Sequence, residues 1–186
     1  MELKHRTQLP ELLKYFKLPL TAIEIGVAEG YNSFDLLQNG IEKLYMVDNW
    51  GTIDGITGDG NFPQQWHDEN YKSAMNRVSA FSEKVTVLRG LSQLMCDLVE
   101  DESVSLLYLD GDHSYEGVMR DLRLWYPKVV KGGIIAGHDY LNKSYGVNKA
   151  VSDFMWDVSC GRDNNCEPML IAEDNECDAG FWFVKV

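Results

Sequence analysis

The chain has 186 residues, of which 45% are hydrophobic and 25% are charged. This is an ordinary globular composition, and the length predicts one domain that spans residues 1–186. With 17 basic and 29 acidic residues, the formal net charge is −12. Because a protein that binds nucleic acid needs clustered Lys and Arg, this balance disfavours nucleic acid or an anionic membrane as a partner.

The N-terminus and the cysteines favour a cytoplasmic protein. Residues 1–20 are expected to form an N-terminal helical segment, and their first half lacks the apolar stretch of a secretory signal. No apolar run in the sequence is long enough to span a bilayer. Four cysteines show neither a CxxC pair nor zinc-finger spacing, so we expect reduced thiols, with a disulfide among the last three as the alternative. They are Cys96, Cys160, Cys166 and Cys177.

Short apolar runs bounded by Gly or Asp recur along the chain, and each has the length of a buried strand. Five of them precede the C-terminal region: Thr21–Ile25, Lys43–Val47, Val85–Leu88, Val104–Leu109 and Gly133–Ala136.

Helical patterns lie between these runs. Asp68 is expected to cap one helix, and Ser114 is expected to cap another that ends by Gly132-Gly133. The apolar face of the first holds Tyr71, Met75, Val78 and Phe81, and that of the second holds Val118, Leu122, Trp125 and Val129.

The alternation of strands and helices predicts an α/β fold with a doubly wound, mostly parallel sheet. Pro168–Ala172 and Phe181–Val186, separated by an acidic turn, predict an antiparallel C-terminal hairpin at one sheet edge. Residues 51–66 interrupt the alternation as a loop insertion, in which Gly51–Pro63 holds four glycines without any periodicity. Such a loop is either a functional lid or a plain surface insertion.

A doubly wound sheet binds ligands at the carboxyl ends of its strands. After the first strand, Gly26 and Gly30 permit a tight turn and close approach of a ligand. After the second strand come Asp48 and Asn49, and an acid at this point can accept both hydroxyls of a ribose. The first turn lacks the G-x-G-x-x-G fingerprint of pyrophosphate binding, so an adenosine-type ligand without phosphates is favoured. The third strand ends near Ser92, where an adenine ring could lie.

The fourth and fifth strand ends bring two carboxylates, Asp110 and Asp139, together with His113 and His138. Oxygen ligands with an imidazole suit a hard or intermediate divalent ion, which could bind substrate oxygens and lower the pKa of a hydroxyl. His113 could accept the hydroxyl proton as a general base. Each histidine taken alone could be structural, but the concentration of four such groups favours a functional site.

The sequence Asp110-Gly-Asp-His-Ser-Tyr-Glu116, followed by Gly132-Gly-Ile-Ile-Ala-Gly-His-Asp-Tyr140, resembles class I S-adenosylmethionine-dependent methyltransferases. It is most similar to small bacterial O-methyltransferases related to macrocin O-methyltransferase, and more distantly to catechol O-methyltransferase. The resemblance covers about residues 23–140. It implies a Rossmann-like methyltransferase fold with a seven-stranded sheet and an antiparallel last strand.

The resemblance also implies that S-adenosyl-L-methionine is the cofactor. The methionine end would lie at Glu24, Gly26 and Asn32, the ribose at Asp48, and the adenine between Gly90 and Ser92. The full set of expected cofactor-binding residues is Glu24, Gly26, Gly30, Asn32, Asp48, Asn49, Gly90, Ser92 and Asp110.

In metal-dependent members of this group, the residue matching Asp110 and an acidic pair after the fifth strand bind magnesium. The pair here is His138-Asp139, so the expected metal ligands are Asp110, His138 and Asp139. The imidazole shifts the preference from magnesium towards manganese, iron or zinc. Related macrolide methyltransferases also have a histidine where His113 stands, and the expected catalytic residues are His113, Asp110 and His138.

The predicted function is therefore methyl transfer to a hydroxyl of a small molecule such as a sugar, a glycan precursor or a natural product. Two alternatives are a nicotinamide-dependent oxidoreductase on the same sheet and a non-catalytic module that binds an adenosine ligand or a glycan. Asp110-Gly-Asp-His replaces the Pro-Pro motif of base-modifying N-methyltransferases, which argues against DNA-base methylation. In so short a chain, acceptor selectivity is expected to come from loops or from a partner subunit in a homo-oligomer.

Overall fold

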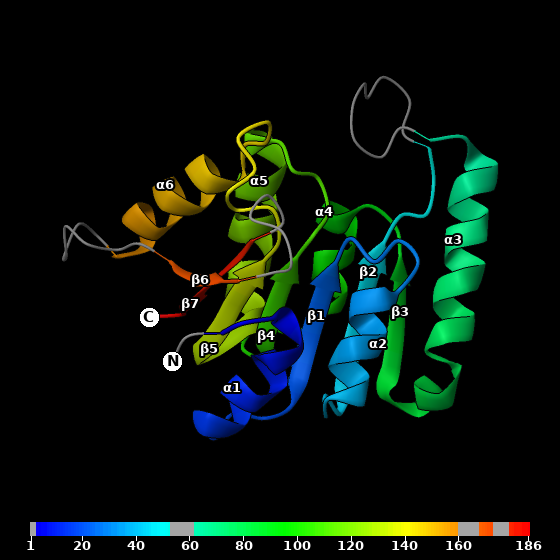
Figure 1. Cartoon of the computed structure of the whole chain (residues 1–186), viewed down its shortest axis with the longest axis horizontal. Helices are drawn as coiled ribbons and strands as arrows, with labels where there is room; N and C mark the ends of the chain where they lie inside the picture. Colours follow the sequence, from blue (N-terminus) through cyan, green and yellow to red (C-terminus); the bar gives the residue numbers. More distant parts are fainter. Residues whose placement is uncertain (1–2, 53–61, 160–167, 173–178) are drawn as a thin grey trace.

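The computed structural model describes residues 3–52, 62–159, 168–172 and 179–186, which contain a seven-stranded sheet in the order β3-β2-β1-β4-β5-β7-β6 (Figure 1). The first five strands are mutually parallel, whereas β7 runs antiparallel to both β5 and β6. The predicted fold class is therefore confirmed. The strands are β1 (Thr21–Ile25), β2 (Lys43–Asp48), β3 (Val85–Arg89), β4 (Val104–Leu109), β5 (Val129–Gly137), β6 (Met169–Ile171) and β7 (Gly180–Val184).

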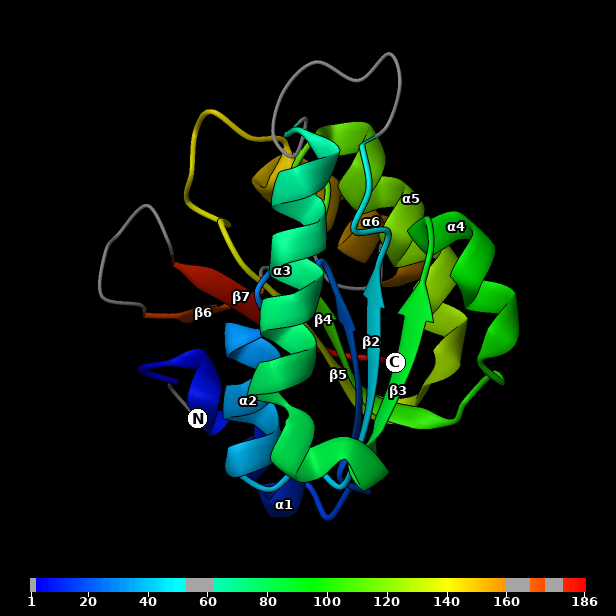
Figure 2. The same ribbon diagram turned by 90° about the vertical axis from the view of Figure 1, so that its right-hand side faces the viewer.

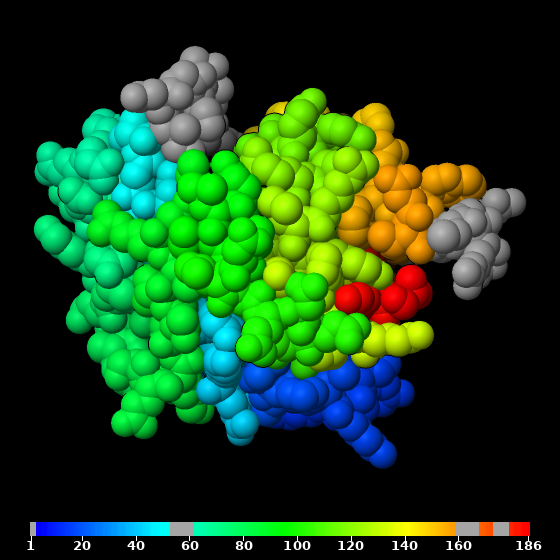
Figure 3. All heavy atoms as spheres, turned by 180° about the vertical axis from the view of Figure 1, so that it is seen from behind, coloured from blue at the N-terminus to red at the C-terminus, as the bar shows by residue number. Residues whose placement is uncertain are grey.

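Helices cover both faces of the sheet, and the two layers are seen edge-on in Figure 2. One layer comprises α1 (Leu9–Tyr15), α2 (Tyr31–Gln38) and α3 (Gln64–Arg77). The other comprises α4 (Ser92–Met95), α5 (Tyr115–Trp125) and α6 (Val147–Ser159), and it is the face shown in Figure 3. Four short 3₁₀ segments are Arg6–Gln8, Ser79–Lys84, Cys96–Leu98 and Tyr126–Lys128.

The central strands are mostly apolar because their side chains alternate between two buried layers. In β4, Leu107 and Leu109 pack into the cluster beneath α5 and α6, whereas Leu106 and Tyr108 pack into the cluster beneath α1 and α2. All six residues of β4 are buried. The carboxyl ends of the strands are thus held by close packing on both sides.

The beginning of α3 differs from the sequence prediction. The helix begins at Gln64, directly after Pro63, so residues 64–66 are helical instead of part of the loop insertion. Asp68 therefore lies inside the helix and does not cap it. Its fully buried face is also less apolar than predicted, because the buried residues of α3 are His67, Asn70 and Ala74.

The cap of α5 is as predicted, since the Ser114 hydroxyl accepts a hydrogen bond from the Gly117 amide at 3.0 Å. The end of this helix was predicted wrongly. It stops at Trp125, and Val129 begins β5, which pairs irregularly with β4. Gly132 lies in this irregular part of β5 with φ +78°, so the glycine pair shapes a strand and does not end the helix.

Leu3 lies at the β6 edge of the sheet. Leu3 forms a parallel bridge with Ile171 and accepts a hydrogen bond from the Ala172 amide at 3.1 Å. The predicted turn of the hairpin, residues 53–61 of the loop insertion, and three cysteines (Cys160, Cys166 and Cys177) lie outside the described residues. Cys96 is buried as a free thiol. No helix in the described ranges combines the length and apolar character needed to cross a membrane.

Two glycines with left-handed backbone provide a test of the loop geometry. An alanine Cβ at Gly26 (φ +85°) would lie 2.1 Å from the Asp110 carbonyl oxygen, whereas one at Gly132 (φ +78°) would contact no described atom within 4 Å. We expect Gly132→Ala to lower the free energy of unfolding by about 1–2 kcal/mol, the cost of the left-handed conformation alone. Gly26→Ala should cost clearly more in urea denaturation. Equal losses for the two variants would contradict the close contact between the β1–α2 loop and Asp110.

Candidate active site

The loop after β1 is held from behind by Glu24, whose side chain is buried. Its carboxylate accepts hydrogen bonds from Asn32 Nδ2 at 3.1 Å and from the Ser33 hydroxyl, so it ties the end of β1 to the start of α2. Asn32 Oδ1 is buried and has no hydrogen-bond partner among the described residues. Burial raises the pKa of Glu24 to about 8, although the bonds from Ser33 and Asn32 oppose this shift.

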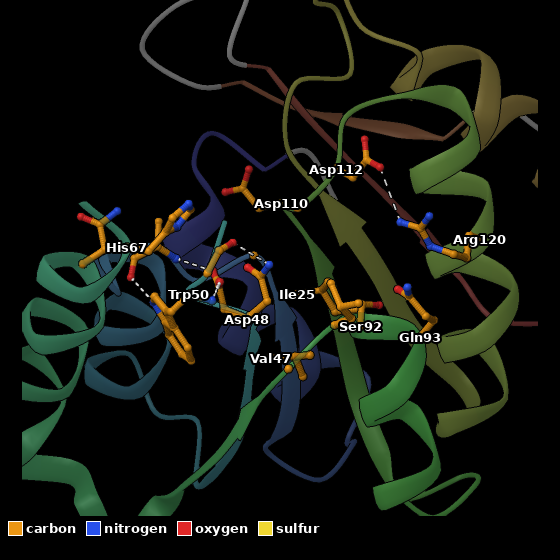
Figure 4. A pocket seen from close by; sticks show the side chains of 18 of the residues that line it. Ile25, Val47, Asp48, Trp50, His67, Ser92, Gln93, Asp110, Asp112 and Arg120 are labelled. Carbon is orange, nitrogen blue, oxygen red and sulfur yellow. Dashed lines mark hydrogen bonds and ion pairs between the residues drawn. The ribbon is translucent and has the colours of Figure 1, made fainter. Parts of the chain in front are cut away.

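Asp48 connects the loops that follow β1 and β2 (Figure 4). Its Oδ2 accepts hydrogen bonds from the amides of Val27 and Ala28, both at 2.9 Å, and its Oδ1 accepts one from the Trp50 amide at 2.7 Å. The Trp50 indole donates to the Ala28 carbonyl at 2.9 Å. The carboxylate therefore organises the strand ends as well as facing the space between them.

A cavity of about 240 Å³ opens at these strand ends. It reaches from α3 and Asp48, across the loop after β3, to Asp110 and Arg120 (Figure 4). Of the predicted cofactor-binding residues, six line the cavity: Gly26, Asp48, Asn49, Gly90, Ser92 and Asp110. Glu24, Gly30 and Asn32 are absent from its lining and lie in the supporting structure, where a Cβ on Gly30 would be 3.0 Å from Ala74 of α3.

Ser92 connects this cavity to the core beneath α5. Its hydroxyl donates to Asp121 Oδ1 at 2.5 Å and accepts a hydrogen bond from the Trp125 indole at 2.9 Å. Burial raises the pKa of Asp121 to about 6, against the opposing effects of the Ser92 hydrogen bond and the charge of Arg120. These contacts fix the start of α4 at the predicted adenine end of the cavity.

Asp110, His113 and Asp139 come together where β4 and β5 end. His113 Nε2 lies 3.4 Å from Asp110 Oδ1 and 3.3 Å from Asp139 Oδ2. One ligand atom from each of the three residues lies within 4.8 Å of the others. The His113 ring stacks on Tyr145 with centroids 4.7 Å apart. Asp139 has a left-handed backbone (φ 56°), which is costly for a non-glycine residue and is typical of functional positions.

His138 lies beside this cluster. Its Nδ1 is 3.0 Å from Asp139 Oδ2 and 3.9 Å from Asp110 Oδ1. Burial alone would lower the pKa of His138, but the hydrogen bond to Asp139 and the two nearby carboxylate charges raise it. Burial would likewise raise the pKa of Asp139, but the hydrogen bond and charge of His138 and the charge of His113 lower it. Both histidines thus lie beside the two carboxylates, and His113 forms with Asp110 and Asp139 the group whose ligand atoms lie within 4.8 Å of one another.

Several residues of the cavity wall were missed from the sequence. They come from α3, α4 and α5, and they include His67, Asn70, Gln93 and Arg120. The sequence shows that His67, Asn70 and Ala74 share one helix face. Because two of the three are polar, this face does not give the apolar pattern that predicts burial. Only the packing of α3 against the β1–α2 loop shows that this face is buried.

The family described as "Methyltransferase domain" matches residues 23–140 of the chain. This is more than half of the sequence, and the chain belongs to that family. The resemblance to methyltransferases is thereby confirmed at the level of the family.

Individual relatives are distant. Protein R132 of Acanthamoeba polyphaga mimivirus is 27% identical over 149 residues, which are 77% of this chain and 62% of R132. Protein y4gI of Sinorhizobium fredii is 26% identical over 69% of this chain, which is 14% of its own length. The chain therefore spans less than two thirds of the length of these curated relatives.

Solved structures share the fold at low sequence identity. An O-methyltransferase from Bacillus cereus, solved in complex with SAH, has a TM-score of 0.68 at 12% identity and covers 97% of this chain and 80% of its own. The calicheamicin methyltransferase CalS11 has a TM-score of 0.62 at 16% identity, over 94% of this chain and 77% of its own.

The raised pKa of Glu24 predicts a pH dependence of stability. The ordinary pKa is 4.5 and the folded value is about 8, so the folded protein holds this proton more tightly and loses stability as pH rises between the two values. From about pH 6.5 to pH 8 the loss should be about 2 kcal/mol, at 1.36 kcal/mol per pKa unit. Urea denaturation at both pH values should show a smaller loss for Glu24→Gln.

Asp121→Asn is the matched control for this measurement. The folded pKa of Asp121 is about 6, so its effect is complete below the measured pH window. This variant should keep the wild-type loss between the two pH values. If Glu24→Gln lost as much unfolding free energy between the two pH values as the wild type, Glu24 would ionise without cost in the folded state.

Proposed function

We propose that the protein is an S-adenosylmethionine-dependent O-methyltransferase that acts on a hydroxyl of a small molecule. This proposal rests on the residues that line one cavity, in a chain that belongs to the methyltransferase family. Asp48 lies in its wall at the end of β2, and Asp110, which also lines it, belongs to the cluster with His113 and Asp139. Such a cavity can hold a nucleoside beside a group that accepts a proton.

The residues present fit this cofactor. Gly26 and Gly90 line the cavity and allow its loops to pack closely, because a Cβ at these positions would lie 2.1 Å from the Asp110 carbonyl oxygen and 2.7 Å from Met95 Cε. The buried Oδ1 of Asn32, which has no partner among the described residues, is the kind of acceptor that the ammonium group of a methionine moiety requires. When bound, S-adenosylmethionine supplies a methyl group on a positively charged sulfur. The carboxylates of Asp48 and Asp110 favour a cationic ligand in this cavity.

His113 is the proposed proton acceptor for the acceptor hydroxyl. Its Nε2 lies between the carboxylates of Asp110 and Asp139, which stabilise the imidazolium that forms. Stacking on Tyr145 fixes the orientation of the ring. A general base positioned in this way contributes about 10²–10⁴-fold to the rate.

A divalent cation at the same cluster is the second candidate, favoured by the three ligand atoms of Asp110, His113 and Asp139 within 4.8 Å. Two carboxylates with one imidazole suit manganese, iron or zinc as well as magnesium. A bound cation would supply positive charge that lowers the pKa of a hydroxyl. In that case His113 is a ligand and does not act as the base.

The acceptor is proposed to be a sugar, a glycan precursor or a natural product. CalS11, a structural neighbour, is a calicheamicin methyltransferase, which is one example of this acceptor class on the same fold. The net charge of −12 disfavours a polyanionic acceptor such as nucleic acid. From the sequence, we also propose that the protein forms a homo-oligomer and is located in the cytoplasm.

Titration calorimetry with S-adenosylhomocysteine tests the cofactor directly. We expect binding to the wild-type protein and at least about tenfold weaker binding to Asp48→Asn, because an acceptor that faces the cavity is replaced by a donor. Asp157→Asn, which changes an exposed aspartate of α6, should bind as the wild type does. Failure of the wild type to bind, or tighter binding of NADH, would contradict the proposal in favour of an oxidoreductase or a different ligand.

A second experiment distinguishes His113 as the general base from a divalent cation that lowers the pKa of the acceptor hydroxyl. Release of S-adenosylhomocysteine is measured over a panel of hydroxylated acceptors, with and without a strong chelator. If His113 is the base, His113→Ala lowers turnover by about 10²-fold or more while chelation leaves the wild type unchanged. If turnover of the wild type is lost on chelation and restored by Mn²⁺, the cation is required and His113 is assigned as its ligand.

A further inference from the structure

The wall of the cavity that α3 provides contains two buried polar side chains without an assigned role. His67 and Asn70 are 6% and 4% exposed, and both line the cavity. They are three positions apart and therefore lie on one face of the helix. In Figure 4, His67 lies on the same side of the cavity as Trp50 and Asp48.

Each of these side chains carries a polar atom that the protein leaves unpaired. His67 Nε2 and Asn70 Nδ2 are buried and have no hydrogen-bond partner within the described part of the chain. Buried polar atoms are normally paired, because an unpaired one has lost its bonds to water without replacement. The same face of α3 continues into the core with Ala74, so an apolar side chain would suit these positions if packing were their only role.

Asp48, on the same side of the cavity, has too few free acceptor positions for a ribose diol. A carboxylate oxygen has two lone pairs, and Oδ2 already accepts two bonds, from Val27 and Ala28. Oδ1 accepts one bond, from Trp50, so one acceptor position remains. A ribose presents two neighbouring hydroxyls. Asp48 can therefore bind only one of them unless it releases an amide that holds the loop.

We propose that His67 and Asn70 bind the ribose hydroxyl that Asp48 cannot accept, so that the diol is shared between β2 and α3. This inference rests on the proposed function, since it names the part of the cofactor that these residues recognise. A hydroxyl both donates and accepts, so it pairs with His67 Nε2 in either tautomer and accepts from Asn70 Nδ2. Binding then satisfies two atoms that have no partner among the described residues.

The test combines cofactor affinity with the stability of the protein alone. His67→Phe and Asn70→Leu keep similar volumes but remove the polar atoms. Calorimetry with S-adenosylhomocysteine should show binding about tenfold weaker for each variant, the effect of one lost hydrogen bond. Thermal unfolding without ligand should occur at the wild-type temperature or above it, because an unpaired buried group has been removed. Asn76→Leu, at an exposed position of the same helix, should leave the affinity unchanged.

An analogue of S-adenosylhomocysteine without the two ribose hydroxyls identifies the contact. It should bind the wild type and the two variants with equal affinity, because the hydroxyl that they recognise is missing. His67→Gln, which presents an amide nitrogen near the position of Nε2, should recover part of the affinity for S-adenosylhomocysteine.

Three results would overturn the inference or its basis, and they differ from one another. Unchanged affinity for S-adenosylhomocysteine in both variants, with the unfolding temperature lowered, would assign the two residues a structural role. An equal loss of affinity for both ligands would show that they contact a part of the cofactor other than the ribose. If the wild type binds neither ligand, the proposed function itself fails.

Discussion

The geometry of the site depends on the carboxylate of Asp48 and the three backbone amides that it accepts. These bonds join the loop after β1 to the loop after β2, and Trp50 adds a further link through its indole. Bonds from amides to a charged acceptor are among the stronger hydrogen bonds in proteins. One side chain thus fixes two loops and also faces the ligand cavity, so structural and binding roles cannot be separated by simple removal of Asp48.

The buried carboxyl groups Glu24 and Asp121 extend this support into the two helical layers. Glu24 holds the start of α2 from one side of the sheet, and Asp121 holds Ser92 from the other. Both have raised pKa values because burial disfavours their charged forms. Glu24 is therefore mostly protonated at physiological pH, whereas Asp121 is mostly ionised there, and Asp48 and Asp110 face the cavity directly.

The sheet and the strand-end residues were predictable because their signals are local. Continuous apolar runs identified the strands, and the parallel alternation then placed Asp48, Asp110 and Asp139 at one edge. The wall contributed by α3 was not predictable, since His67 and Asn70 give no apolar periodicity and the burial of that face depends on distant packing. The left-handed backbone of Asp139, directly after β5, also needed coordinates. Spacing along the sequence does not encode that conformation.

The contact of Leu3 with Ile171 has a consequence for the sheet as a whole. β6 is the outermost strand, and its free hydrogen-bonding groups could otherwise pair with another molecule. The chain covers this edge with its own beginning, through the bridge and the bond between Ala172 and Leu3. The edge is thus protected from aggregation only when a residue near the start of the chain has joined a strand near its end. Protection of this edge therefore carries the entropic cost of closing a loop that spans almost the whole sequence.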